Sequence, residues 1–383
     1  MRNYKLLLAS VCAVSICLFP SCDDGDETIA LELSSAIPSD ASAGESPLVD
    51  RSSVSIPNFH FQDEDFQGES VVRLDMTGLW DKNNQKWMYL YGTGSSKQNI
   101  WIELDGSPKG FLVHNTIDDQ DKDHVAQADL VFLVDNSGTM DDESDAVARD
   151  IAKWAELLDN SGTDMEFACV GYRYGNINGA IDFTDASSLS SFLNYGTGPS
   201  RTSHFGGSSS SSLQSYARNF YKVSDECGGM ALRFADSYLS FRSGANRIYV
   251  NFTDEPNQPN YYSNYSTESF NTNWSSQQGT VHTVFSSADT LRYGEKINYS
   301  EKPWRISWYT GGTILFADQY FTDVDLNKLP VTGAIQNSYI FRFVINNSLR
   351  DGYYHNLVVT VKSKDGQIQA RRAYSLNFGT LKD

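Results

Sequence analysis

The chain has 383 residues, of which 40% are hydrophobic and 13% aromatic. This composition supplies a core and excludes a disordered chain, and the length predicts two domains or one large domain with additions. Acidic residues outnumber basic ones by 48 to 30, giving a formal net charge of −18. Because no Lys/Arg-rich stretch occurs, nucleic acid and anionic membrane surfaces are poor partners, and cations are better ones.

The first 21 residues have the pattern of a secretory signal. Arg2 and Lys5 precede an apolar run over 6–19, which is too short to cross a bilayer as a mature helix. The run ends in LFPSC at residues 18–22, which resembles the lipobox of bacterial lipoproteins. That resemblance implies cleavage before Cys22 and lipidation of this cysteine. The alternative is an ordinary signal peptide with an incidental cysteine.

An acidic run, DDGDE at 23–27, follows Cys22. It resembles a signal that sends lipoproteins to the surface of some Gram-negative bacteria, and a solvated spacer is the other interpretation. Up to about Ser53 the chain is rich in Ser, Ala, Pro and acid with no aromatic residue, so 22–53 is predicted to be a flexible tether. Loss of the signal removes two positive charges and leaves a net charge of −20. We expect an outer-membrane lipoprotein, with a periplasmic or a cell-surface location left open.

Two cysteines remain for the folded part. Cys12 and Cys17 leave with the signal and Cys22 would carry lipid, so Cys169 and Cys227 are left. In an exported chain this pair suggests one disulfide.

The middle of the chain alternates strand and helix patterns. Residues 128–134 are a continuous apolar run, typical of a strand buried on both faces. A polar loop follows, and then Val147, Ile151, Trp154 and Leu158 mark one face of a helix. Further strands are predicted at 167–172, 179–183, 247–252, 280–285 and 313–317, and further helices at 185–194, 231–241 and 303–309. This order predicts a doubly wound α/β sheet, which binds ligands at the carboxyl ends of its strands.

Three motifs in this region resemble those of von Willebrand factor type A (VWA) domains. The loop Asp135-Asn136-Ser137-Gly138-Thr139 resembles the D-x-S-x-S metal loop, with Thr139 in place of the second serine. Thr253-Asp254 resembles the later T-D loop, and Thr310-Gly311-Gly312 resembles the T-G-G turn before the last strand. The resemblance covers 126–328 and implies a Rossmann-like VWA domain over these residues.

The residues of the first two motifs are hard oxygen ligands, suited to Mg²⁺, Mn²⁺ or Ca²⁺. The resemblance makes Asp135, Ser137, Thr139 and Asp254 the ligands of a divalent cation at a metal-ion-dependent adhesion site (MIDAS). Neutral hydroxyls leave the ion partly neutralised, so it can take one more carboxylate, which in this family a partner protein typically supplies. The alternative is that Asp135 and Ser137 only cap the following helix.

The third metal loop departs from the family pattern. Glu226 is the first choice for its ligand, and Ser208 or Ser209 is the second. The alternative for the serine run at 208–212 is a plain flexible loop. An acid at this position would neutralise the ion further, which favours calcium or weakens the capture of a partner's carboxylate.

Short alternating patterns flank the central region. They lie at 72–76, 87–91 and 100–104 before it and at 339–344, 357–361 and 368–374 after it, with a hairpin signal at Asp105-Gly106. Each flank is small for an independent sandwich. We therefore predict one Ig-like β-sandwich built from 54–125 and 329–383, an arrangement that resembles bacterial surface proteins with an inserted VWA domain. The alternative is two separate β-modules.

Catalytic signatures are scarce. The six histidines show no H-E-x-x-H spacing, and there is neither a G-x-S-x-G elbow nor a P-loop. We therefore expect a binding module rather than an enzyme. The leading hypothesis is a lipid-anchored envelope or surface protein that binds a protein or extracellular-matrix ligand through the cation, with the aromatic residues of 257–274 as candidate contacts. The alternative is a structural component of an envelope complex in which the metal is merely stabilising.

Overall fold

The computed structural model describes residues 36–54, 56–81, 86–115, 127–160, 164–202, 210–220, 222–223, 225–286, 301–322 and 324–380. The predicted signal, the lipidation site Cys22 and the first part of the tether lie outside these residues. Ser208 and Ser209, the second choice for the third metal loop, also lie outside them.

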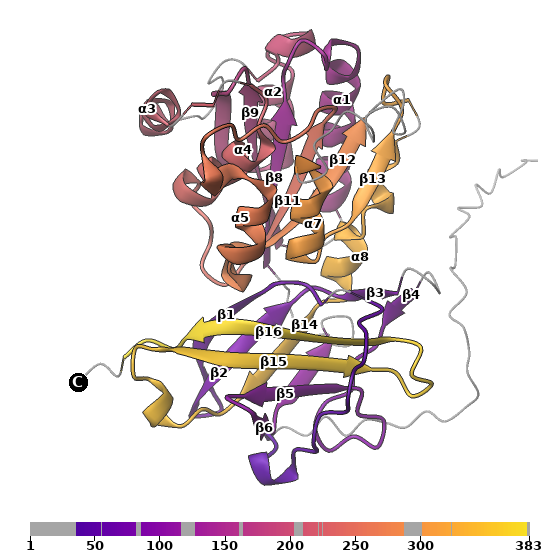
Figure 1. Cartoon of the computed structure of the whole chain (residues 1–383), viewed down its shortest axis with the longest axis vertical. Coiled ribbons are helices and arrows are strands. Elements are labelled where there is room, and N and C mark those ends of the chain that lie inside the picture. The colour runs from indigo at the N-terminus through magenta and orange to yellow at the C-terminus, as the bar shows by residue number, and fades with distance from the viewer. Residues whose placement is uncertain are drawn as a thin grey trace, which may run out of the picture. The chain divides into compact units, whose positions relative to one another are not determined.

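The central region forms a sheet with the strand order β10-β9-β8-β11-β12-β13 among the described residues (Figure 1). All neighbours in this sheet are parallel except β10, which pairs antiparallel with β9. The predicted doubly wound α/β sheet is therefore confirmed. Its strands are β8 (Gln127–Asp135), β9 (Asp164–Arg173), β10 (Asn176–Thr184), β11 (Asn246–Thr253), β12 (Thr280–Ser286) and β13 (Ile314–Ala317).

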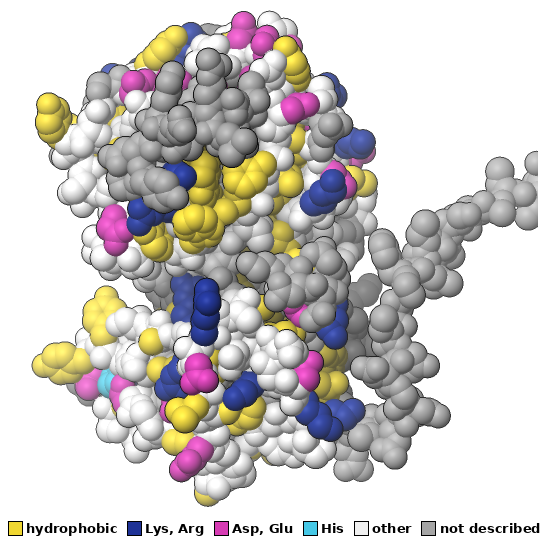
Figure 2. Space-filling model, turned by 45° about the vertical axis from the view of Figure 1, so that its right-hand side comes forward, with side chains coloured by type: hydrophobic (Ala, Val, Ile, Leu, Met, Phe, Trp, Pro, Cys, Tyr) yellow, Lys and Arg dark blue, Asp and Glu magenta, His cyan; other side chains and the backbone are white. Residues whose placement is uncertain are grey.

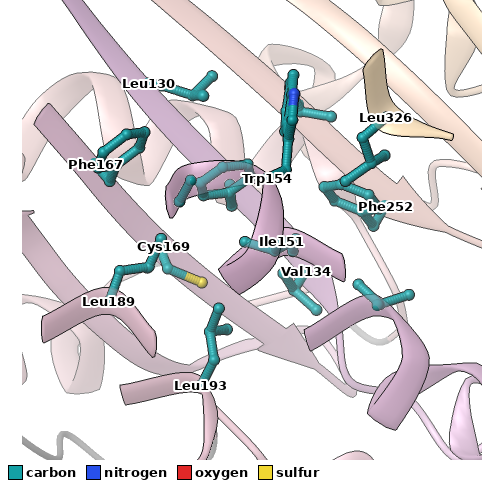
Figure 3. Packing of buried hydrophobic residues seen from close by; sticks show 14 of the residues in the cluster. Leu130, Val134, Ile151, Trp154, Phe167, Cys169, Leu189, Leu193, Phe252 and Leu326 are labelled. Atoms are coloured by element: carbon teal, nitrogen blue, oxygen red, sulfur yellow. The ribbon is translucent and has the colours of Figure 1, made fainter. Parts of the chain in front are cut away.

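Helices cover both faces of this sheet. Among the described residues of the region, the α-helices are α1 (Asp141–Asp159), α2 (Ala186–Leu193), α3 (Ser211–Asn219), α4 (Gly228–Tyr238), α5 (Thr267–Thr272) and α7 (Trp304–Thr310). One core lies under α1 and α2 and includes Trp154 of α1 (Figure 3). Trp154 packs edge-on against Phe132, with ring centroids 6.0 Å apart. A second core lies on the opposite face, under α3 and α4. A helix α8 (Val331–Gln336) follows β13.

The two flanks share two sheets. One has the order β1-β2-β14-β7 and the other β16-β15-β5-β6. Because β14 lies between β2 and β7, and β15 pairs with β5, each sheet needs strands from both flanks. The composite sandwich is confirmed and the alternative of two separate modules is wrong. The bounds are β1 (Phe59–Phe66), β2 (Glu69–Met76), β5 (Ile100–Leu104), β6 (Ser107–Lys109), β7 (Leu112–Asn115), β14 (Tyr339–Phe343), β15 (Tyr354–Lys362) and β16 (Gln369–Asn377), with a small additional pair β3 (Leu79–Asp81) and β4 (Lys86–Met88).

Residues 36–54 differ from the predicted flexible tether. Asp40 binds Lys109 Nζ at 2.5 Å and accepts a hydrogen bond from the backbone N–H of Gly110. Ser53 exchanges hydrogen bonds with Gln369 at the start of β16. The prediction of a tether over 22–53 is therefore wrong for 36–53. The polar composition suggested a solvated segment. In the structure, the Asp40 carboxylate and the Ser53 backbone and hydroxyl form hydrogen bonds with residues of the sandwich.

The predicted disulfide is also wrong. Cys169 and Cys227 are both buried thiols. Cys169 lies in the core under α1 and α2, near Leu189 and Leu193 (Figure 3). Cys227 lies in the core on the opposite face of the sheet, where its Sγ is 3.2 Å from Asn257 Oδ1. The sheet separates the two sulfurs, so they cannot approach the bonding distance of a disulfide.

Charge and hydropathy add two facts about the described surface. On the face that Figure 2 draws, Lys and Arg side chains lie in small separate groups, several of them beside Asp or Glu. Within the described ranges, no helix combines the length and the apolar character that crossing a bilayer requires.

Candidate metal centre

Two predicted ligand loops meet at the carboxyl edge of the sheet. Strands β8 and β11 are parallel neighbours, and Val134 pairs with Phe252. Asp135 is the last residue of β8, and Asp254 follows the last residue of β11. Parallel pairing therefore brings together two carboxylates that lie far apart in the sequence. Both are buried, with 0% of Asp135 and 8% of Asp254 exposed.

Hydrogen bonds join the residues of these two loops. The backbone N–H of Ser137 donates to Asp135 Oδ1 over 2.9 Å, and Thr253 Oγ1 donates to Asp135 Oδ2 over 2.8 Å. Ser137 Oγ lies 2.8 Å from Thr139 Oγ1, which donates to Asp254 Oδ1 over 3.1 Å. All four predicted ligands of the first two loops thus belong to one connected cluster.

The alternative role as a helix cap is not observed. The N-cap of α1 is Met140, and no side chain accepts a capping hydrogen bond there. Asp135 instead accepts from its own loop and from Thr253. Its position at the strand end is therefore tied to the cluster, rather than to the start of α1.

Glu226 is a buried residue just before α4. Only 4% of its surface is exposed, and its backbone carbonyl accepts a 3.0 Å hydrogen bond from Gln258 N–H. Burial, a hydrogen bond with Asp225 and the charge of Asp135 raise the pKa of Glu226 to about 8. Within the described ranges, Glu226 does not join Asp135 and Asp254 in a group of three acids placed to hold a metal, so its role as a ligand stays a prediction.

The buried carboxyl groups repel one another. Burial, followed by the charge of Asp254, raises the pKa of Asp135 to about 7. Burial, followed by the charge of Glu255, raises the pKa of Asp254 to about 6. In water-excluded surroundings such a cluster needs either protons or a cation.

The donor set fits a hard cation. It consists of carboxylate and hydroxyl oxygens, with no sulfur or imidazole ligand, which is the chemistry of Mg²⁺, Mn²⁺ and Ca²⁺ sites. Within the described ranges, no group of three or more His, Cys, Asp or Glu side chains is placed to hold a metal. The fit therefore depends on the hydroxyls of Ser137 and Thr139 together with the carboxylates.

The third motif, Thr310-Gly311-Gly312, has a structural role at the end of α7. Thr310 Oγ1 accepts a 2.9 Å hydrogen bond from Val281 N–H, and Gly311 ends α7 with a φ of 82°. A Cβ on Gly312 would lie 1.9 Å from the carbonyl oxygen of Val281. The T-G-G turn therefore fixes α7 to β12 at the start of β13, and it contributes no ligand to the cluster.

Sequence reasoning missed two buried residues near the metal loops. Glu143, in the first turn of α1, is 3% exposed, and burial together with the charge of Asp254 raises its pKa to about 7. Thr202 is fully buried, with its hydroxyl over Gly171. An acid on the inward face of a predicted helix was a detectable signal for Glu143. No local pattern marks Thr202.

The aromatic residues of 257–274 divide into two sets. Tyr265 and Phe270 are buried in the core under α4, and Trp274 packs partly buried against the same core, with its Nε1 donating to the Gly279 carbonyl over 2.8 Å. Tyr261 is fully exposed and Tyr262 is 40% exposed. Only the second pair remains a candidate for contact with another molecule.

Comparison with known proteins found no matching family model and no matching curated protein. Among solved structures, the chain is similar to the conserved hypothetical protein BatB from Bacteroides thetaiotaomicron, with 15% identity, 55% of this chain and 95% of that chain covered, and a TM-score of 0.34. It is similar to a von Willebrand factor type A protein from Catenulispora acidiphila, with 9% identity, coverage of 87% and 76%, and a TM-score of 0.30. A third is the pilus adhesin SpaC from Lactobacillus rhamnosus GG in its open conformation, with 10% identity, coverage of 86% and 55%, and a TM-score of 0.36. From its own strand order and the meeting of its D-x-S-x-T and T-D loops, the central domain is VWA-like in fold.

Proposed function

We propose that Asp135, Ser137, Thr139 and Asp254 hold a divalent cation, with Glu226 as an additional ligand or charge partner. The observation that carries this proposal is the hydrogen-bonded cluster in which two buried carboxylates, those of Asp135 and Asp254, are joined through Ser137 and Thr139. Burying like charges together raises the free energy of the folded state, and a bound cation would lower it again. Mg²⁺, Mn²⁺ and Ca²⁺ are the candidates.

The function proposed for this site is the binding of a protein or matrix ligand through one of the ligand's carboxylates. The hydroxyls of Ser137 and Thr139 are neutral, so they lower the charge of the ion less than carboxylates do. A cation at the edge of the sheet could then attract a carboxylate from a partner. Exposed Tyr261 and Tyr262 follow the Asp254 loop in the chain and would supply apolar contact area.

A second candidate is a structural or assembly role with a purely stabilising ion. Glu226 favours it. Asp135, Asp254 and Glu226 together carry three negative charges when ionised, which exceeds the charge of one divalent ion. A fully neutralised ion attracts an additional carboxylate weakly. In that case a chelator would lower the melting temperature without releasing any partner.

Calorimetric titration with Mg²⁺, Mn²⁺ and Ca²⁺ tests the cation site. Wild-type protein should bind, and Asp135→Asn should lose binding at this site. Asp142→Asn is the matched control, because Asp142 is an exposed acid on the neighbouring turn of α1. Equal heats for wild type and Asp135→Asn would contradict the site.

Affinity capture from the envelope fraction, with and without chelator, separates the two roles. Release of the same proteins by chelator and by Asp135→Asn supports ligand binding through the ion. An unchanged partner list, together with a lower melting temperature, supports the stabilising role.

Attachment to the bacterial envelope through Cys22 is a separate proposal from the sequence. Growth with a labelled fatty acid tests it, because the wild-type protein should take up the label and Cys22→Ser should not. Protease treatment of intact cells would then distinguish a surface location from a periplasmic one.

A further inference from the structure

An open pocket lies where α4 meets the segment that contains α5 (Figure 1). Its volume is about 330 Å³, and it is lined by Arg233, Asn264, Tyr265 and Asn273. Arg233 belongs to α4, Asn264 and Tyr265 to a short 3₁₀ turn before α5, and Asn273 caps the end of α5. The volume is in the range of small-ligand sites, and the lining includes none of the proposed cation ligands.

The guanidinium group of Arg233 is held in place in this pocket. Its Cζ lies 4.5 Å from the ring centroid of Phe270 and 5.3 Å from that of Trp274. Nε donates to the carbonyl of Asn264 over 3.3 Å, and Nη1 donates to the carbonyl of Asn273 over 3.4 Å. Stacking on aromatic rings occupies the faces of a guanidinium and leaves its edge for hydrogen bonds. The group is therefore ordered before any ligand arrives, which lowers the entropy cost of binding.

Arg233 keeps donors for a ligand. A guanidinium has five N–H groups, and the two carbonyls take two of them. Within the described ranges, Nη2 forms no hydrogen bond, and no carboxylate forms a salt bridge with Arg233. Asp236, one turn along α4, instead accepts a hydrogen bond from Gln278 and pairs with Arg247. A planar pair of nitrogens, Nη1 and Nη2, can therefore receive a carboxylate with two parallel hydrogen bonds.

The rest of the lining is polar and uncharged. Asn264 and Asn273 are exposed, and neither side-chain amide is hydrogen-bonded within the described part of the chain. Each amide offers both a donor and an acceptor, which matches the neighbouring hydroxyls of a sugar ring. Tyr265 packs against Tyr262 with ring centroids 5.7 Å apart, and Tyr262 remains 40% exposed. An aromatic surface, on which the C–H face of a sugar can pack, therefore adjoins the pocket.

We propose that this pocket binds an acidic saccharide, through one sugar residue that carries a carboxylate, as a uronic acid does. Arg233 would receive the carboxylate, and Asn264 and Asn273 would bind ring hydroxyls. Charge-assisted hydrogen bonds are stronger than neutral ones, so the carboxylate should decide which sugar is preferred. The inference goes beyond the proposed function, because the pocket acts without the cation and without a protein partner.

Ligand-observed NMR titration of the whole chain in chelator tests the proposal. The probes are methyl glucuronide and methyl glucoside, which differ only by a carboxylate in place of a hydroxymethyl group. Wild type should bind the glucuronide at least about tenfold more tightly. Arg233→Gln should lose this preference, and Asn264→Ala should weaken the binding of both sugars. Arg218→Gln is the matched control, because it removes an exposed arginine of α3 that does not line the pocket.

The failures of this site and of the cation site are distinguishable. Asp135→Asn should bind the glucuronide as wild type does, and loss of binding in that variant would overturn the pocket. The proposal is also overturned if wild type does not bind the glucuronide, or if Arg233→Gln, folded by circular dichroism, keeps the preference. If Arg233→Gln does not fold, unchanged affinity of Asn264→Ala for both sugars overturns it. Tighter binding of acetyl-glutamate methylamide than of the glucuronide would assign the pocket to acidic peptides instead.

Discussion

Thr253 Oγ1 donates a 2.8 Å hydrogen bond to Asp135 Oδ2 across 118 residues of sequence. This bond orients the carboxylate from the end of the neighbouring strand, while Ser137 N–H holds the other oxygen. The two donors fix the direction in which Asp135 presents its remaining lone pairs. Thr253 therefore acts on a bound cation through Asp135 rather than by contact.

Replacement of Thr253 by Val should weaken cation binding by roughly tenfold to a hundredfold, the range found when a group that orients a metal ligand is lost. Val has a similar shape but cannot donate a hydrogen bond. Thr253→Ser keeps the hydroxyl and should retain most of the affinity. Calorimetry on both variants provides the measurement, and equal affinity of Thr253→Val and wild type would show that this bond has no role in binding.

Asp135 should make the cation-free protein less stable as the pH rises. Its folded pKa of about 7 lies above the ordinary value of 3.8. Both states are protonated at low pH, and between about pH 4 and 7 only the unfolded state releases the proton, so the free energy of unfolding falls. In chelator at pH 8, Asp135→Asn should be more stable than wild type by up to about 4 kcal/mol.

Urea unfolding at pH 4, 6 and 8 measures this difference. The gap between Asp135→Asn and wild type should close at pH 4. Added cation should stabilise wild type at pH 8 more than it stabilises the variant. A variant that is less stable than wild type at pH 8 in chelator would show that the buried charge is compensated in another way.

His282 should have the opposite pH dependence. Its Nδ1 accepts a hydrogen bond from Thr313 N–H, so this nitrogen is unprotonated in the fold, and burial lowers the pKa from 6.5 to about 4. Below pH 6.5 His282 takes up a proton in the unfolded state, whereas in the folded state it does so only near pH 4. His282 therefore removes up to about 3 kcal/mol of stability between pH 6.5 and pH 4.

The variant His282→Asn isolates this contribution, because an amide oxygen can accept from Thr313 and does not titrate. Relative to wild type, the variant should gain stability as the pH falls from 7 to 4. Chemical unfolding of both proteins in the same buffers gives the comparison. A constant difference across this range would contradict the assignment.

Gly312→Ala should destabilise the central domain strongly. The new Cβ would lie 1.9 Å from the carbonyl oxygen of Val281, which is backbone and cannot rotate away. We expect a loss of about 2–4 kcal/mol, in the range of strong packing defects. Gly138→Ala is the control from the metal loop, since its nearest neighbour would be Tyr174 Oη at 3.5 Å. Thermal unfolding should show a large shift for the first variant only.

Local patterns determined much of this protein. Continuous apolar runs predicted the strands of the central sheet, and the spacing of Val147, Ile151, Trp154 and Leu158 predicted the buried face of α1. The D-x-S-x-T and T-D motifs predicted two loops that do meet. These features were readable because burial periodicity and loop chemistry are properties of short segments.

Tertiary structure decided what depends on contacts between distant segments. Cys169 and Cys227 looked like a pair, but the sheet places their thiols in different cores. Polar residues around Asp40 looked like a tether, but Lys109 and Gly110 hold that carboxylate. Glu143 looked like one of several acids at a helix start, and only the packing of α1 against β12 places it against Ser286. In each case the deciding quantity is the register and burial of elements far apart in sequence, which no local pattern contains.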